Sequence, residues 1–147
     1  MQQQTFAEVT FEQYRKPTRR EQFLNEMNRV VPWAELVSVI EPVYPKAEGP
    51  GRPPVGVERM LRLHCLQQWF NLSDPAVEEA LYDSRAMRQF VGIDLGREPV
   101  PDETTICKFR HLLEAHQIGE QLFVQIGAYL AAHGMKVSRG TIVDATI

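Results

Sequence analysis

A sequence of 147 residues is long enough for one domain with a substantial core, and its 44% hydrophobic and 24% charged residues exclude an intrinsically disordered chain. The formal net charge of −3 argues against a protein that binds nucleic acid through its overall charge. No apolar run reaches the roughly 18 residues of a membrane span, and the first residues lack a secretory-signal pattern. The two cysteines, Cys65 and Cys107, predict no disulfide framework. We therefore expect a cytoplasmic protein with no membrane partner.

The first residues predict an arm followed by two helices. Residues 1–17 are polar with scattered aromatic side chains and no clear period, so we interpret them as an N-terminal arm. A helical domain is expected over residues 18–134. Thr18 and Glu21 form a capping box at its start, and Pro32 suits the first turn of a second helix that ends near Pro42.

A loop and a core helix follow. Residues 45–55 predict an extended loop or linker within the helical domain, because 45–54 contain four prolines and two glycines. Residues 57–72 are the most apolar helical pattern and predict the central core helix, with Arg62 and Gln67 on its outward face. His64 and Cys65 point about 100° apart on a helix, so core packing explains them better than a metal site.

The next segment is a helix-turn-helix candidate. Asp74 is predicted to cap a short helix with Pro75 at its first position. A core helix, a tight turn and a short second helix are typical of this motif. The second helix shows acids where a recognition helix shows cations or amides, so Arg85 and Arg88 in the following turn are the better DNA-contact candidates.

The last two helices have clear boundaries. Asp102 precedes Glu103, Thr104 and Thr105, which predicts an N-capped helix over 103–115 with Lys108 and Arg110 on its outward faces as a candidate phosphate clamp. A final long helix should end at His133–Gly134. Cys107 and His111 are four residues apart, but no further ligand has suitable spacing, so we do not predict a metal site there.

Basic residues are unevenly placed along the chain. From charge alone, the favoured interpretation of the clusters at 15–20 and 52–62 is a solvated surface. Arg52 lies between Gly51 and Pro53, an extended setting that suits entry into an A·T-rich minor groove, although a connecting loop remains the favoured interpretation.

The residues from Val137 onward favour a β-strand that is apolar on both faces. Asp144 interrupts this strand. A carboxylate in a buried strand is costly unless it binds a metal or a partner. From the residues alone, the favoured interpretation is that the strand ends and Asp144 is solvated.

Three separated motifs carry a resemblance to a known family. The N-terminal helical domain of bacterial insertion-sequence-five transposases is similar to LYDSRAMRQFVGIDL at 81–95 and PVPDETTICKFRHLL at 99–113. The opening strand of their catalytic domain is similar to GTIVDATI at 140–147, and the Gly-Arg-Pro-Pro segment at 51–54 also matches. The resemblance covers most of the chain from about Glu21 onward.

The resemblance implies a fold and a chemistry. The expected fold class is mainly α: a multi-helix N-terminal domain with helix-turn-helix-like elements, then a single C-terminal β-strand, residues 135–147, of a truncated ribonuclease-H-like catalytic domain. In this family of DDE enzymes Asp144 would be the first catalytic carboxylate and a ligand of one of two Mg²⁺ ions. The family's second Asp and its Glu are not present, so we expect Mg²⁺ only in a complete enzyme, no cofactor for this chain and no activity of this chain alone.

The leading hypothesis is a DNA-binding part of a transposase that recognises element ends. The expected partner is double-stranded DNA carrying the terminal inverted repeats, the expected assembly is a homo-oligomer, and the expected location is the bacterial nucleoid. The side chains predicted to contact DNA, mostly at phosphates, are Arg15, Lys16, Arg19, Arg20, Arg52, Arg59, Arg62, Arg85, Arg88, Lys108 and Arg110. The alternative is a helical protein-interaction module that dimerises through Trp33, Trp69 and neighbouring apolar residues without binding DNA.

Overall fold

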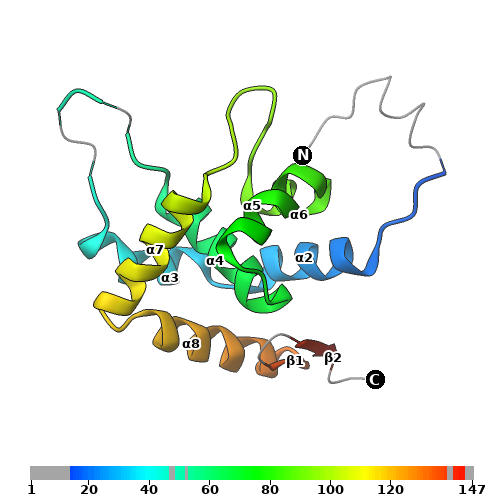
Figure 1. Cartoon of the computed structure of the whole chain (residues 1–147). Coiled ribbons are helices and arrows are strands. Elements are labelled where there is room, and N and C mark those ends of the chain that lie inside the picture. The colour runs from blue at the N-terminus through cyan, green and yellow to red at the C-terminus, as the bar shows by residue number, and fades with distance from the viewer. Residues whose placement is uncertain (1–13, 47–48, 52, 139–140, 145–147) are drawn as a thin grey trace.

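A computed structural model describes residues 14–46, 49–51, 53–138 and 141–144. Within these ranges seven α-helices form a single helical assembly, shown in Figure 1. The mainly helical fold class is confirmed. Residues 1–13 of the predicted N-terminal arm (residues 1–17) and Arg52 lie outside the described residues. None of the described helices is long and apolar enough to cross a membrane.

The first two helices begin as their sequences predict. Helix α2 (Arg19–Val30) has Thr18 as its N-cap, and the Thr18 hydroxyl accepts a hydrogen bond from the Glu21 backbone N–H at 3.1 Å. Helix α3 (Trp33–Ile40) follows Pro32 and continues into a short 3-10 turn, η1 (Glu41–Val43). The loop after it contains no helix or strand in its described residues, and the Tyr44 hydroxyl donates to the Val55 carbonyl across it.

Helix α4 (Val57–Phe70) is the centre of the core and contacts α3, α5, α6 and α7. Its Trp69 ring packs at 5.3 Å from Phe23 of α2 and 5.8 Å from Phe90 of α6. Trp69 is 1% exposed and Trp33 is 7% exposed. Both tryptophans therefore belong to the intramolecular core, and the prediction of a dimer surface built on them is wrong. Truncating a side chain as large as Trp69 to alanine should cost about 3–5 kcal/mol.

Two serines define the next pair of helices. Helix α5 (Asp74–Asp83) is capped by Ser73, whose hydroxyl accepts from the Ala76 N–H at 3.2 Å. The prediction that Asp74 is the cap was wrong by one residue, because its carboxylate is engaged elsewhere. The chain breaks again at Ser84, which caps α6 (Arg85–Val91) by accepting from the Met87 N–H at 3.2 Å.

The second half of the domain is a loop followed by two helices. Gly92, with φ of 89°, ends α6 in the left-handed region and opens the loop to Pro101. Asp102 caps α7 (Glu103–Ala115) by accepting from the Thr105 N–H at 2.8 Å, so the predicted helix and cap are confirmed. Helix α8 (Gly119–Ala132) runs along the lower edge in Figure 1 and ends at His133–Gly134 as predicted.

The C-terminal segment differs from the single strand expected. Strands β1 (Met135–Ser138) and β2 (Thr141–Asp144) form an antiparallel two-stranded hairpin in which Met135 is opposite Asp144. The expected strand therefore has its main-chain partner immediately upstream in the sequence, and a hairpin satisfies one edge of each strand. That this strand opens a catalytic sheet stays a prediction.

Candidate nucleic-acid interface

Three of the predicted contact residues lie exposed at the start of α2. Lys16, Arg19 and Arg20 are exposed where the chain enters this helix, and we call these three residues the α2 basic cluster. Lys16 and Arg19 make no ion pair with the residues the structure describes, and the Arg20 guanidinium lies 5.1 Å from the Phe70 ring centroid. Cations in such a setting can exchange water and counterions for phosphate oxygens at little cost.

Local contacts hold this cluster in place. The Thr18 cap fixes the helix start between Lys16 and Arg19. Arg15 is also exposed, but its guanidinium pairs with the Glu21 carboxylate at 2.7 Å across that cap. Arg15 thus joins the incoming segment to the first turn of α2, and its charge is already partly neutralised.

Arg59, a predicted DNA contact, fastens the 92–101 loop to α4. Its guanidinium donates to the Glu98 carboxylate at 2.7 Å and to the Gly92 carbonyl at 2.8 Å. Both acceptors lie more than thirty positions away along the chain. Because both acceptors belong to the 92–101 loop, these two bonds from Arg59 order that loop against α4.

Arg62 was expected on the outward face of α4, and that expectation was wrong. Its side chain is 12% exposed. The guanidinium lies 4.3 Å from the Trp33 ring centroid and donates to the Asn28 side chain at 2.8 Å and the Phe90 carbonyl at 3.0 Å. Arg62 therefore joins α4 to α2, α3 and α6, with Glu58 as its ion-pair partner on the same helix at 3.2 Å.

Arg88 stabilises the end of a helix. Its guanidinium donates to the carbonyls of Leu81 at 2.9 Å and Tyr82 at 2.7 Å, which are orphan acceptors in the last turn of α5. Arg85 lies at the first position of α6, is partly buried, and also has an interaction within the chain. Both residues were expected in a turn and lie instead in α6, and their contact with DNA stays a prediction.

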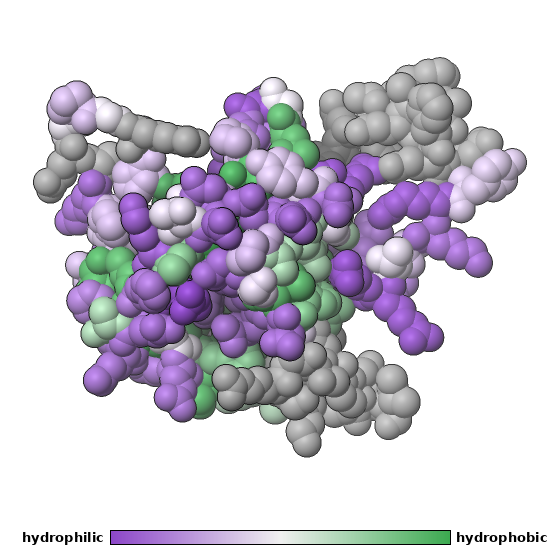
Figure 2. Space-filling model, viewed as in Figure 1, coloured by the Kyte–Doolittle hydropathy of each residue, from purple (hydrophilic) through white to green (hydrophobic). Residues whose placement is uncertain are grey.

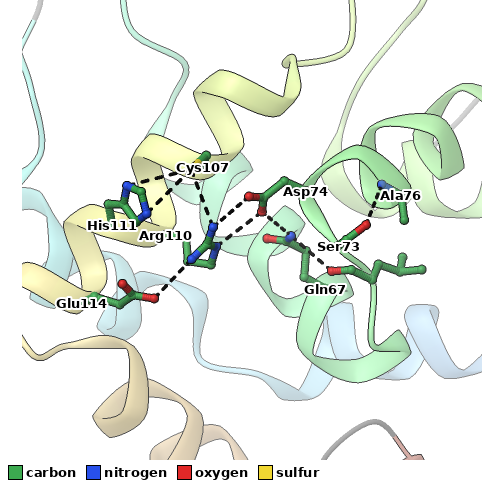
Figure 3. A network of polar contacts seen from close by, with 9 residues as sticks. Gln67, Ser73, Asp74, Ala76, Cys107, Arg110, His111 and Glu114 are labelled. Atoms are coloured by element: carbon green, nitrogen blue, oxygen red, sulfur yellow. Dashed lines mark hydrogen bonds and ion pairs between the residues drawn. The ribbon is translucent and has the colours of Figure 1, made fainter.

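Arg110 is the centre of a polar network between α5 and α7, drawn in Figure 3. Its Nη2 lies 2.9 Å from Asp74 Oδ2 and its Nη1 lies 3.3 Å from Glu114 Oε1. The hydrogen bond from Arg110 is the main reason that the pKa of Asp74 is lowered, and the bond from Gln67 adds to it. The same ion pair raises the pKa of Arg110. The predicted phosphate clamp is thus closed on an internal carboxylate.

Gln67 completes this network from the core. It was predicted to face outward, but it is 6% exposed, and its Nε2 donates to Asp74 Oδ1 at 2.9 Å and to the Leu72 carbonyl at 3.3 Å. That prediction was wrong because a glutamine amide can be buried wherever both its neighbours accept hydrogen bonds. Neither Gln67 nor Asp74 was singled out as a partner of Arg110 from the sequence.

Lys108 is the one residue of the α7 candidates that remains exposed, and it makes no ion pair within the described chain. Next to it, the Cys107 sulfur lies 3.6 Å from Arg110 Nη2 and 3.7–3.8 Å from the two ring nitrogens of His111. The described residues contain no group of three or more His, Cys, Asp or Glu side chains that could hold a metal.

Asp144 ends strand β2, where its main chain is paired with Met135. Its side chain lies outside what the structure describes, so its assignment as a catalytic and metal-binding residue stays a prediction.

His64 lies beside this network. It was predicted to pack in the core, and its ring lies 6.1 Å from that of Phe109. Its Nδ1 is buried without a hydrogen-bond partner among the described residues. Burial lowers the pKa of His64 to about 4, and the nearby positive charge of Arg110 acts in the same direction.

The predicted contact residues divide into cations that stay exposed and cations that bind other parts of the fold. Figure 2 shows that hydrophilic side chains cover most of the face viewed in Figure 1 and extend furthest at the edge where the chain enters α2. The α2 basic cluster and Lys108 are the predicted contacts that stay exposed without an acidic partner among the described residues, whereas Arg59, Arg62, Arg88 and Arg110 hold the fold together.

Comparison with known families matches the description "Transposase domain (DUF772)" over residues 11–112. This match spans more than half of the chain and includes helices α2 to α6 and most of α7. The chain belongs to this transposase-domain family. No solved structure matches it. The matched range contains every predicted DNA-contact residue from Arg15 to Arg110 and excludes α8, the hairpin and Asp144.

Proposed function

We propose that this transposase domain is the DNA-binding N-terminal part of an insertion-sequence transposase of the insertion-sequence-five type, and that it recognises the terminal inverted repeats of its element. The family match supports a role in transposition. The resemblance of residues 81–95, 99–113 and 140–147 to the insertion-sequence-five group supports the finer assignment.

The observation that carries the proposal is the α2 basic cluster. Its three side chains are exposed within five consecutive positions, on a chain whose net charge is −3. A local concentration of unpaired cations on an acidic protein attracts a polyanion at one place rather than over the whole surface. These contacts would position the duplex at its phosphates, and they carry no sequence information by themselves.

Sequence preference would then come from elements that the cluster brings near the duplex. In Figure 1 the segment entering α2, the described residues of the 45–56 loop and the 92–101 loop all extend toward the upper side of the molecule, away from α8. Arg59 fixes the second of these loops to α4 through Glu98 and Gly92. We assign Arg59, Arg62, Arg88 and Arg110 a positioning role in this interface rather than direct phosphate contacts.

The proposal assigns this chain binding and no catalytic step. Two-metal phosphoryl transfer requires several carboxylates around the ions. Asp144 is the single residue that the family resemblance offers as a ligand, and the described residues provide no cluster of metal-binding side chains.

The test is a fluorescence-anisotropy titration with labelled duplexes. The two ends of the element that encodes the chain supply the specific duplexes, and a shuffled duplex of the same composition is the control. The proposal predicts tighter binding to the end sequences, by about 10³-fold or more if recognition is typical of specific DNA-binding proteins. Equal affinity for the end and shuffled duplexes would contradict end recognition, and no binding at low salt would contradict DNA binding.

A further inference from the structure

The 92–101 loop is held at its base by contacts with distant parts of the chain. Ile93 and Val100 are buried, so both ends of the loop are fixed to the core. Between them, the Glu98 carboxylate accepts from Arg59 of α4, which also donates to a carbonyl at the start of the loop. A loop with two apolar anchors and a long-range arginine bridge has lost much of its conformational freedom before any ligand binds.

The tip of the loop is a closed turn. The Asp94 carbonyl accepts from the Arg97 N–H at 2.9 Å and from the Glu98 N–H at 3.0 Å. The Asp94 carboxylate accepts from the Gly96 N–H at 2.9 Å. Residues 94–97 are all exposed. The turn therefore presents its side chains to solvent on a backbone that its own hydrogen bonds have already ordered.

Arg97 is the exposed cation of this tip. Its side chain is 87% exposed, whereas that of Arg59 at the base of the loop is 32% exposed. The Arg97 Nε lies 3.6 Å from Asp94 Oδ2, which limits the directions in which the guanidinium points. Its two terminal nitrogens bind no other group among the described residues. A planar fork of donors matches a pair of acceptors such as guanine O6 and N7.

We propose that Arg97 contacts a guanine at its major-groove edge in the element-end duplex, with Asp94 as the residue that positions the guanidinium. This inference rests on the proposed function and names the residue that would supply its sequence preference. The α2 basic cluster would contact phosphates, which carry no sequence information, so a second element has to contact the bases. An arginine bidentate to guanine is the commonest base-specific contact in protein–DNA complexes.

The chemistry of the tip favours the major groove over the minor groove. Asp94 is 66% exposed beside Arg97, and the negative potential of a narrow minor groove would repel its carboxylate. The major groove is about 12 Å wide, which is enough for a turn, and it presents cytosine N4 donors as well as guanine acceptors. Leu95 is 42% exposed on the same tip and suits contact with a thymine methyl group, which also lies in the major groove.

The loop and the α2 basic cluster are spaced to meet one duplex. Arg62 donates to Asn28 in the last turn of α2 and to the Phe90 carbonyl, two residues before the loop. The base of the loop therefore lies near the C-terminal end of α2, and the cluster lies at the other end. A helix of 12 residues is about 18 Å long, roughly half of the 34 Å that one turn of B-DNA occupies.

The test is a base-substitution scan of the element-end duplex, measured by fluorescence anisotropy with the full chain. Each base pair is changed in turn, and the dissociation constants of the wild type and of Arg97→Ala are compared. Changing one G·C pair should weaken wild-type binding about 10-fold or more. The same change should alter the affinity of Arg97→Ala by less than about twofold, because the contact is already lost. Deazaguanine at that position, in which a C–H group replaces the N7 acceptor, should also weaken wild-type binding.

Two variants separate base recognition from a general loss of positive charge. Arg97→Lys keeps the charge without the forked donors, so it should lose the guanine preference while it binds the shuffled duplex as the wild type does. Arg29→Ala is the matched control, because Arg29 is likewise an exposed arginine paired with an acidic residue, Glu26, three positions before it. This control should keep the full guanine preference.

Asp94→Asn tests the positioning role. The amide oxygen still accepts from the Gly96 N–H, but the negative charge beside Arg97 is removed. Affinity for the shuffled duplex should rise, because a charge that repels phosphates is lost, and the guanine preference should fall. A purely structural role of Asp94 would not produce these two opposite changes, and an unchanged guanine preference would contradict the positioning role.

The outcomes distinguish this inference from the proposed function. If the wild type prefers the element end and Arg97→Ala shows the same penalty at every G·C pair, the inference is overturned and the proposed function stands. Equal weakening of the end and shuffled duplexes by Arg97→Ala would make Arg97 a phosphate contact and would also overturn it. If the wild type binds the two duplexes equally, the proposed function fails and the inference fails with it.

Discussion

Arg62 is predicted to stabilise the fold, and its replacement by alanine measures by how much. The change removes charged hydrogen bonds to Asn28 and to the Phe90 carbonyl and a cation–π contact with Trp33. A hydrogen bond to a charged group contributes about 1.5–3 kcal/mol and a desolvated cation–π contact about 1–2 kcal/mol. Because these contributions are not additive and Glu58 is left with solvent, we expect a loss of about 2–4 kcal/mol.

Urea denaturation followed by circular dichroism measures this loss, and the midpoint of thermal unfolding should fall by roughly 5–15 °C for a domain of this size. Arg19→Ala is the control, since Arg19 is exposed and its removal should change stability by less than about 0.5 kcal/mol. Arg62→Lys keeps the charge but not the forked geometry, so it should recover only part of the stability. If Arg62→Ala left stability unchanged while DNA affinity fell sharply, Arg62 would be a phosphate contact and the structural role given to it here would be refuted.

Three further outcomes follow from titratable groups of α4 and α5. The pKa of His64 is about 4 in the folded chain and about 6.5 in the unfolded chain. The free energy of unfolding should therefore fall as the pH drops through this window, by about 2 kcal/mol between pH 7 and pH 5. Denaturant curves of the wild type and of His64→Asn test whether the variant loses this pH dependence. Because Arg110 lowers the pKa of Asp74, the stability from their ion pair is present above about pH 4 and is lost as the pH falls through the lowered pKa. The variant Asp74→Asn should lose about 1–2 kcal/mol of unfolding free energy at pH 7. Its acid denaturation should also depend less steeply on pH. Burial raises the pKa of Cys65 to about 12, which keeps its thiol protonated and unreactive. A thiol reagent should therefore label Cys107 alone in the native chain and both cysteines in denaturant. Labelling of both cysteines without denaturant would contradict the burial of Cys65.

Helix positions were predictable wherever a local cap and a periodic apolar face coincide. Asp102 and Thr18 were identified as N-caps from residues next to them in sequence, and both accept the expected backbone hydrogen bonds. The start of α5 shows the limit of this reasoning. Ser73 and Asp74 are both good capping residues, and the choice between them depends on Arg110, which lies 36 positions downstream.

The roles of the arginines could not be predicted, because they depend on contacts between distant segments. Arg62 is accessible on an isolated helix, yet it becomes covered once Asn28, Trp33 and Phe90 assemble around it. Arg59 similarly meets Glu98 only when the 92–101 loop folds back onto α4. An arginine in the sequence predicts a cation, and the surrounding fold decides whether that cation binds a ligand or an internal carboxylate.

The most direct test of DNA binding through the α2 basic cluster is the salt dependence of binding to an element-end duplex. The triple variant Lys16→Ala, Arg19→Ala, Arg20→Ala should bind more weakly than the wild type. The slope of log affinity against log salt concentration should also become shallower by about two to three, since each lost phosphate contact contributes about 0.9. Arg29→Ala, an exposed residue at the other end of α2, should leave the slope unchanged. Equal slopes for the wild type and the triple variant would contradict the account, because the duplex would then be bound by a different surface.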